Sequence, residues 1–248
     1  MLKMWMLIGL GWGNGHSQTN GEYLHPTDHI TVSENINATA PMTKTEMQVR
    51  DASVKVVTYS GHGSGALIQY KDMQFVFTAE HVVDDRHTRN YKIEKFGVNK
   101  MGVVVYADPV HDIAILYLPE KFEEFKPMKF EAHKDIIPVG AEVTFSGYPS
   151  NHQLMTVRGR VAGYEHLRKA GTQIIIHTYG WFGSSGSVVF TEKGHIAGIL
   201  WGVDVEHPND WPQIIEDMVW VVPIKNLNFE AAIATACENY NSGQRACK

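Results

Sequence analysis

Residues 183 to 187, Gly183-Ser184-Ser185-Gly186-Ser187, form a small polar stretch that runs directly into the apolar run Val188-Val189-Phe190. This pattern predicts a tight loop that leads into a β-strand. The glycines let the backbone bend closely around a serine hydroxyl and leave room for a substrate carbonyl. Serine is a weak nucleophile by itself, so the loop indicates chemistry only if a histidine base and a carboxylate lie elsewhere in the chain.

A histidine stands just after an apolar run, in Phe75-Val76-Phe77-Thr78-Ala79-Glu80-His81. An imidazole at the end of a strand lies at the rim of a sheet, where a base can reach solvent and substrate. A structural histidine that caps a strand end fits the same pattern, and most of the 13 histidines in the chain cannot be catalytic. His81 therefore indicates a base only in combination with suitable partners.

A carboxylate opens another apolar run, Asp112-Ile113-Ala114-Ile115-Leu116. A carboxylate at such a position is partly removed from water, which is unfavourable unless another group pairs with it. An imidazole N–H is one such partner, and the carboxylate would then fix the ring's tautomer and stabilise its charged form. The alternative is a charge at a strand end that faces water.

The three candidates follow the order His81, Asp112, Ser185, with separations of 31 and 73 residues. Catalytic triads on unrelated folds differ in this order: subtilisin-like enzymes begin with the aspartate, and α/β-hydrolases with the serine. The α/β-hydrolase motif also needs a glycine two residues after the serine, where this chain has Ser187. The order is that of chymotrypsin-like enzymes.

Short runs of β-branched and aromatic residues recur between turn signals from Ser53 onward, which predicts an all-β fold of barrels or a sandwich. The predicted strands are 54–59, 66–70, 75–78, 103–106, 113–118, 142–145, 153–163, 173–177, 187–190, 195–201 and 218–222. A more polar connection over 120–140 divides them into two sets. The apolar and alanine residues over 226–239 follow a pattern typical of a helix, which predicts a C-terminal helix. The expected division is 1–50, a leader or loosely attached arm; 51–130 and 131–225, two β-barrels; and 226–248, a helix and tail.

Composition excludes several classes of function. Of the 248 residues 44% are hydrophobic and 20% are charged, which is typical of a folded globular protein. The net charge of −5 does not favour binding to the negatively charged backbone of a nucleic acid.

The two ends of the chain carry signals of their own. The apolar run 4–12 is too short to span a bilayer, and it is either a secretory signal or part of a leader. Two cysteines, Cys237 and Cys247, could form a disulfide in an exported protein.

No metal site or cofactor is expected. His62, in Gly61-His62-Gly63-Ser64-Gly65, and the run His207-Pro208-Asn209-Asp210 both lack the spacing of a tetrahedral site. Solvated loops account for them better.

Four motifs resemble those of the trypsin-like serine peptidases: Thr78-Ala79-Glu80-His81-Val82-Val83, the Asp112 run, Gly147-Tyr148-Pro149 and the Ser185 loop. The resemblance covers about residues 53–225. The bacterial glutamyl endopeptidases, the Deg-type heat-shock proteases and the small viral proteases are the nearest branches. This resemblance implies two packed antiparallel six-stranded β-barrels, no cofactor, and a peptide or protein substrate.

The same resemblance implies a role for each catalytic position. Ser185 would be the nucleophile, His81 the general base and acid, and Asp112 the group that orients His81. Backbone N–H groups of Gly183 and Ser185 would form the oxyanion hole, which stabilises the charge that develops on the substrate carbonyl.

The segment Gly194-His195-Ile196-Ala197-Gly198-Ile199-Leu200-Trp201-Gly202 resembles the strand that lines the specificity pocket in that family. Leu200 stands where many relatives have a serine that supports the catalytic aspartate. Trp181, Phe182 and Trp201 would give the pocket an aromatic, apolar lining, and no acidic residue precedes Ser185 to attract lysine or arginine. We therefore expect an uncharged preferred side chain; the alternative is that these aromatic residues fill the core.

The sequence thus predicts a serine endopeptidase that acts through an acyl-enzyme on Ser185. The alternative is a catalytically silent trypsin-like domain that serves as a binding or structural module. The sequence leaves the location of the protein open: a short N-terminal signal would make it secreted or extracytoplasmic, and a viral protein would act in the host cell.

Overall fold

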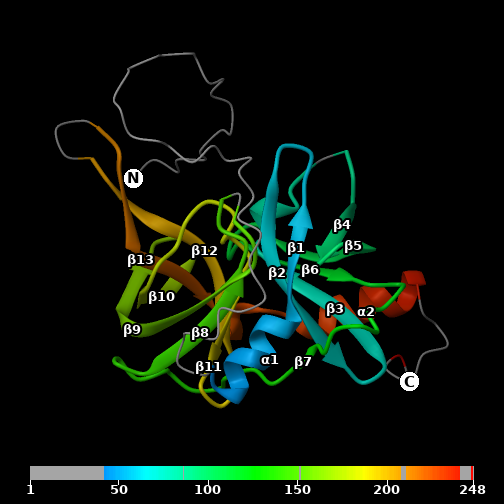
Figure 1. Ribbon diagram of the computed structural model, residues 1–248. Helices are drawn as coiled ribbons and strands as arrows, with labels where there is room; N and C mark the ends of the chain where they lie inside the picture. The colour runs from blue at the N-terminus through cyan, green and yellow to red at the C-terminus, as the bar shows by residue number, and fades with distance from the viewer. Residues whose placement is uncertain (1–41, 86, 151, 208–210, 241–246, 248) are drawn as a thin grey trace, which may run out of the picture. The chain divides into compact units, whose positions relative to one another are not determined.

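The computed structural model describes residues 42–85, 87–150, 152–207, 211–240 and 247. The predicted signal and most of the predicted arm fall within residues 1–41, outside the described residues. From Met42 onward the chain forms a single unit that consists mainly of β-strands (Figure 1). Among the described residues, no helix is both long and apolar enough to cross a membrane.

The first barrel is built by the strands that precede residue 130. They are β1 (Ser53–Val57), β2 (His62–Tyr70), β3 (Met73–Thr78), β4 (Asn90–Lys95), β5 (Val98–Asp108), β6 (Ile113–Tyr117) and β7 (Met128–Lys129). The strand order is β1-β4-β5-β6-β3-β2, and the antiparallel pairing of β1 with β2 closes the ring of six. The short strand β7 adds to β2 in parallel, outside this ring.

The second barrel contains six later strands. They are β8 (Glu142–Gly147), β9 (Met155–Leu167), β10 (Gly171–His177), β11 (Val188–Thr191), β12 (Ile196–Glu206) and β13 (Gln213–Pro223). They close in the order β10-β13-β12-β11-β8-β9, with every pairing antiparallel. The predicted all-β fold with two six-stranded antiparallel barrels is confirmed.

Apolar side chains fill both barrels and the contact between them. Every residue of β3 and β6 is buried, which explains their nearly continuous apolar sequences. Val188, Phe190 and Ile196 of the second barrel belong to the same apolar cluster as the core of the first. The two barrels therefore share a core where they meet.

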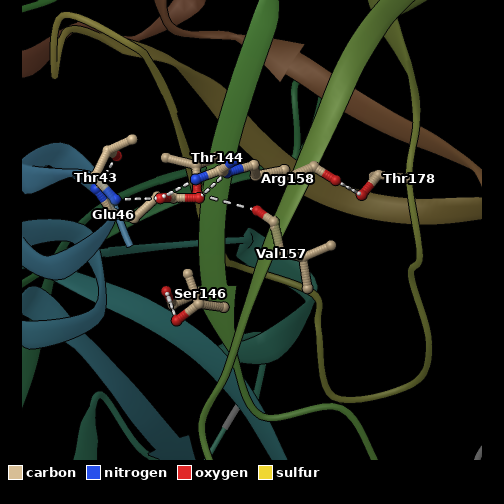
Figure 2. A network of polar contacts seen from close by, with 8 residues as sticks. Thr43, Glu46, Thr144, Ser146, Val157, Arg158 and Thr178 are labelled. Carbon is tan, nitrogen blue, oxygen red and sulfur yellow. Dashed lines mark hydrogen bonds and ion pairs between the residues drawn. The ribbon is translucent and has the colours of Figure 1, made fainter. Parts of the chain in front are cut away.

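Helix α1 (Lys44–Ala52) occupies the end of the predicted arm and packs against both barrels. Thr43 and Glu46 form a capping box at its N-terminus, and Val49 and Ala52 are fully buried. Figure 2 shows Glu46 facing Arg158 of β9, with which it makes an ion pair. The helix is a fixed part of the fold because both its apolar face and its carboxylate have partners.

The predicted C-terminal helix is present as α2 (Phe229–Tyr240). The ring of Phe229 contacts four aromatic rings of the first barrel, with centroids 4.2–5.4 Å away. Those rings belong to Tyr70, Phe75, Phe77 and Phe130. A disulfide joins Cys237 of the helix to Cys247.

Candidate active site

His81 and Asp112 lie together at one end of the first barrel. His81 is in the 3-10 helix η1 (Glu80–Val82), directly after β3, and Asp112 directly precedes β6. Because β3 and β6 pair antiparallel, with Thr78 opposite Ala114, the end of one strand lies beside the start of the other. Topology therefore brings two residues 31 positions apart into contact.

The Asp112 carboxylate bonds to His81 through both of its oxygens. One oxygen accepts the backbone N–H of His81 at 2.8 Å, and the other lies 2.7 Å from ring atom Nδ1. A ring that donates from Nδ1 carries its free lone pair on Nε2, which is the tautomer of a general base. Asp112 has a φ of 54°, in the left-handed region that a non-glycine residue adopts only at some cost.

The surroundings of His81 favour its charged form. Burial lowers the pKa of His81, but the hydrogen bond and charge of Asp112, with smaller contributions from Asp84 and Glu80, outweigh it and raise the pKa above its ordinary value. Glu80 is affected in turn: burial, followed by repulsion from Asp112 and Asp84, raises the pKa of its carboxyl. An imidazolium that forms during a reaction would thus be stabilised.

The loop that carries Ser185 docks against this end of the first barrel. The carbonyl of Ser185 accepts the N–H of Ser64 on β2 at 2.8 Å. Gly186 fits so closely that a Cβ atom there would lie 2.2 Å from Thr78 Oγ1 and 3.0 Å from the N atom of Ala79. Thr78 and Ala79 immediately precede η1, so the serine loop reaches the segment that carries His81.

The hydroxyl of Ser185 points toward β12 in this structure. Its Oγ donates to the carbonyl of Trp201 at 3.5 Å, a long bond, and among the described residues it has no bond to His81. Catalytic hydrogen bonds are often loose in the absence of substrate, and rotation about one side-chain torsion redirects a serine hydroxyl. The structure therefore brings the loop and the His81–Asp112 pair together without the final serine–histidine bond.

The backbone around Gly183 is held in place by hydrogen bonds to the carbonyl groups of residues 182 and 183. The Phe182 carbonyl accepts the N–H of Ser150 at 2.5 Å, and the Gly183 carbonyl accepts Ser64 Oγ at 2.6 Å. Because C=O and N–H point in opposite directions in a trans peptide, anchoring the Phe182 carbonyl directs the Gly183 N–H away from Ser150. In the described part of the chain, the N–H groups of Gly183 and Ser185 have no acceptor.

Gly183 also requires the absence of a side chain. Its φ is 88°, and a Cβ atom there would lie 2.4 Å from the Tyr148 carbonyl oxygen. Two unpaired N–H groups on a loop with glycines at positive φ form the kind of concave backbone site that binds anions.

Ser64 is the residue of this site that sequence reasoning missed. It is fully buried; its Oγ donates to the Gly183 carbonyl and accepts the Tyr148 N–H at 2.9 Å, while its carbonyl accepts Thr78 Oγ1 at 2.7 Å. In the sequence it stands between two glycines at the start of an otherwise apolar strand, a setting that does not by itself indicate a role at the site. The neighbouring His62, which the sequence excludes as a metal ligand, contacts the Tyr148 carbonyl through Nε2 at 2.8 Å.

The residues expected to line a specificity pocket have different environments. The side chain of Leu200 is buried in the core of the second barrel, and only its backbone meets the serine loop, through Gly186 and Ser187. The ring of Trp201 is half-buried, and its Nε1 donates to Gln173 at 3.2 Å.

Of the other three pocket residues, Trp181 and Gly202 are partly buried and Phe182 is exposed. The side chain of Phe182 is 50% exposed and meets the ring of Trp181 edge-on. At Gly202 a Cβ atom would meet nothing within 4 Å, whereas at Gly180 it would lie 2.7 Å from Val219. The space beside Gly202 is open, and that beside Gly180 is filled.

The described residues contain no cluster of three or more His, Cys, Asp or Glu side chains that could hold a metal ion. Of the run His207 to Asp210, residues 208–210 lie outside the described residues.

Comparison with known proteins points to one family. A sequence profile described as "Trypsin-like peptidase domain" matches residues 63–199, more than half of the chain. No sequence among curated proteins matches the chain significantly.

Two solved structures share the fold. The Rv3671c protease in an inactive form is 19% identical, with a TM-score of 0.58, and the match covers 79% of this chain and 92% of that one. A serine-to-alanine mutant of Rv3671c from M. tuberculosis, also an inactive form, is 18% identical, with a TM-score of 0.57 and coverage of 81% and 92%.

Proposed function

The chain belongs to the trypsin-like peptidase family, and on this premise we propose that it is a serine endopeptidase with Ser185 as nucleophile. One observation carries the proposal: the Ser185 loop is docked by hydrogen bonds on the barrel end where Asp112 holds His81. Two unpaired N–H groups lie on the same loop. This combination matches the requirements of acyl transfer, namely a nucleophile, a base and an anion site.

In the proposed reaction, Ser185 Oγ attacks the carbonyl carbon of the scissile peptide bond, and its proton passes to His81 Nε2. The N–H groups of Gly183 and Ser185 bind the oxyanion of the tetrahedral intermediate. His81 then returns the proton to the leaving amine, which yields an acyl-enzyme and frees the C-terminal product. Water, activated by His81, hydrolyses the ester in the second half of the reaction.

Asp112 supports each of these steps without reacting. It keeps Nδ1 of His81 as the donor, so that Nε2 is the basic nitrogen, and its charge stabilises the imidazolium. The cost of desolvating its carboxylate is offset by the two hydrogen bonds from His81.

The proposed substrate is a peptide in extended conformation beside Trp201 and Gly202. An extended peptide can add to a strand edge through main-chain hydrogen bonds, and the open space at Gly202 permits its approach. The exposed ring of Phe182, and a stretch before Ser185 that contains no acidic residue, favour an uncharged side chain next to the scissile bond.

Labelling with a fluorophosphonate probe tests the proposal, because the probe reacts with activated serines. We expect labelling of the native protein and none of Ser185→Ala or His81→Ala. Ser187→Ala is the matched control: Ser187 Oγ lies buried in the same loop with no hydrogen-bond partner, so its removal breaks no bond. Equal labelling of Ser185→Ala and native protein would contradict the assignment.

One observation favours a second candidate, a silent domain that binds peptides without cleaving them. It is the bond of Ser185 Oγ to the Trp201 carbonyl, in place of one to His81. A folded protein that never reacts with the probe, at any pH between 6 and 9, would favour this candidate.

A further inference from the structure

The hairpin formed by β12 and β13 extends well past the rest of the second barrel (Figure 1). On one side, β13 pairs with β12 as far as Glu206, which lies opposite Gln213. On the other side, β11 pairs with β12 only as far as Ile199, and the serine loop bonds to Leu200. Within the described residues, this second edge of β12 has no strand partner from Trp201 to Glu206.

This open edge begins at the proposed nucleophile. Ser185 Oγ lies 3.5 Å from the Trp201 carbonyl, and the N–H of Gly186 donates to the Leu200 carbonyl at 2.7 Å. From Trp201 to Glu206 a strand spans about 17 Å, at roughly 3.3 Å per residue. A peptide held at Ser185 can therefore continue along the same edge for several residues.

The hairpin beyond Gly202 is acidic. Asp204 and Glu206 lie on β12, Glu216 and Asp217 lie on β13, and neither strand contains a lysine or arginine. The only ion pair made by these four carboxylates to a described residue joins Asp217 to His177, at 3.6 Å. Near the tip, the side chain of Trp211 is 78% exposed.

We propose that the edge of β12 from Val203 to Glu206 binds the part of a peptide substrate that lies several residues N-terminal to the scissile bond. This extends the proposed function, on which it rests, from Trp201 and Gly202 to a remote recognition site. Antiparallel addition, the more stable arrangement, places the N-terminal side of the peptide against these residues. Asp204 and Glu206 then select basic side chains in that segment.

The test measures binding of fluorescein-labelled peptides to the Ser185→Ala protein, so that it does not depend on turnover. All peptides share the same residues around the scissile bond. One ends three residues before it, and two extend to seven residues, with either lysines or glutamates in the extension. We expect the lysine extension to tighten binding about tenfold over the short peptide and the glutamate extension to give no gain. The advantage should shrink at high salt because it comes from exposed charges.

Charge reversal locates the effect. Asp204→Lys with Glu206→Lys should remove the advantage of the lysine extension and leave binding of the short peptide unchanged. Glu123→Lys with Glu165→Lys, two exposed acids on other elements, makes the same change in net charge and should retain the advantage. Equal binding of all three peptides, or equal loss in both double variants, would overturn the proposal.

The two proposals fail in different ways. A protein that reacts with the fluorophosphonate probe but shows no preference for the lysine extension refutes the remote site alone. A protein that binds the lysine extension tightly but never reacts with the probe refutes catalysis alone.

Discussion

At the scale of single residues, His81 is surrounded by carboxylates that set its charge. Burial alone would lower the pKa of its imidazole, and Asp112, Asp84 and Glu80 together raise it above the ordinary value. A general base must be neutral, so a raised pKa of His81 places the acid limb of the activity profile at higher pH. Asp112 is needed for geometry, whereas Asp84 and Glu80 raise the pKa of the imidazole without holding the ring, and Glu80 is the direct neighbour of His81 in the sequence.

Glu80→Gln should therefore move the acid limb of kcat/KM to lower pH. The substitution removes one negative charge near His81, which lowers the pKa of the imidazole and lets the neutral base form at lower pH. The measurement is hydrolysis of a short peptide between pH 5 and 9. The alkaline plateau should stay close to that of the native protein, and an acid limb that moves upward would contradict the prediction.

Ser64 acts on the reaction through Gly183. Ser64→Ala removes the donor to the Gly183 carbonyl and the acceptor of the Tyr148 N–H, which should cost about 1–3 kcal/mol of stability. Because the Gly183 backbone is then no longer held by the Ser64 hydroxyl, the proposed oxyanion site is less well positioned, and kcat should fall roughly 10–100-fold with little change in KM. Urea unfolding and steady-state kinetics measure the two effects. Ser187→Ala serves as control, and a change in KM alone would speak against a positioning role for Ser64.

The catalytic candidates were predictable because each has a local signal, whereas Ser64 was not. His81 follows an apolar run and Asp112 and Ser185 precede one, and each pattern can be read within about ten residues. The function of Ser64 depends on a bond to a residue 119 positions away. No local pattern indicates such a contact.

At the scale of elements, strand β4 and helix α1 are two elements that the sequence patterns did not predict, and Lys95 connects them. The inward positions of β4 are Tyr91, Ile93 and Lys95, so a charge stands where the pattern of a strand requires an apolar residue. Lys95 is only 1% exposed, and its Nζ donates to the carbonyls of Arg50 and Ser53 at 2.7 and 2.8 Å. These carbonyls end α1, so the lysine satisfies a helix terminus from a neighbouring strand.

Lys95→Met should change how stability depends on pH. Burial lowers the pKa of Lys95 from 10.5 to about 8 in the folded protein. Between these values the unfolded chain binds more protons, so the free energy of unfolding contributed by this group rises with pH. We expect this rise between pH 8 and 10.5 to disappear in the variant, as measured by urea midpoints. Lys92→Met, at an exposed position of the same strand, should keep it.

At the scale of the whole molecule, the candidate site lies where residues from both barrels meet, so their contacts also maintain its geometry. The Ser64 N–H and hydroxyl bind the serine loop directly. Helix α1 links the barrels from outside: Arg50 donates to the Leu154 carbonyl at 2.8 Å, and Lys95 of the first barrel binds the end of the same helix. The barrels could be predicted from strand patterns, but these links join residues more than 40 positions apart in the sequence.

The ion pair between Glu46 and Arg158 makes one such link testable (Figure 2). The hydrogen bond from Arg158, opposed by burial and helped by Thr43, lowers the pKa of the Glu46 carboxyl from 4.5 to about 2. A carboxyl with a lowered folded-state pKa stabilises the protein fully above pH 4.5 and loses this contribution as the pH falls toward 2.

Glu46→Gln keeps a side chain able to complete the capping box but removes the charge that pairs with Arg158. The variant should therefore be less stable than the native protein at pH 7, and the difference between them should shrink steadily below pH 4.5. Urea unfolding at pH 7, 4 and 3 measures this difference, with Glu165→Gln on the exposed side of β9 as the control. A difference that stays constant over this range would mean that α1 is held by its apolar face and cap alone. If the pair instead holds the barrels in register around the serine loop, peptide hydrolysis by Glu46→Gln at pH 7 should fail at a lower urea concentration than that of the control.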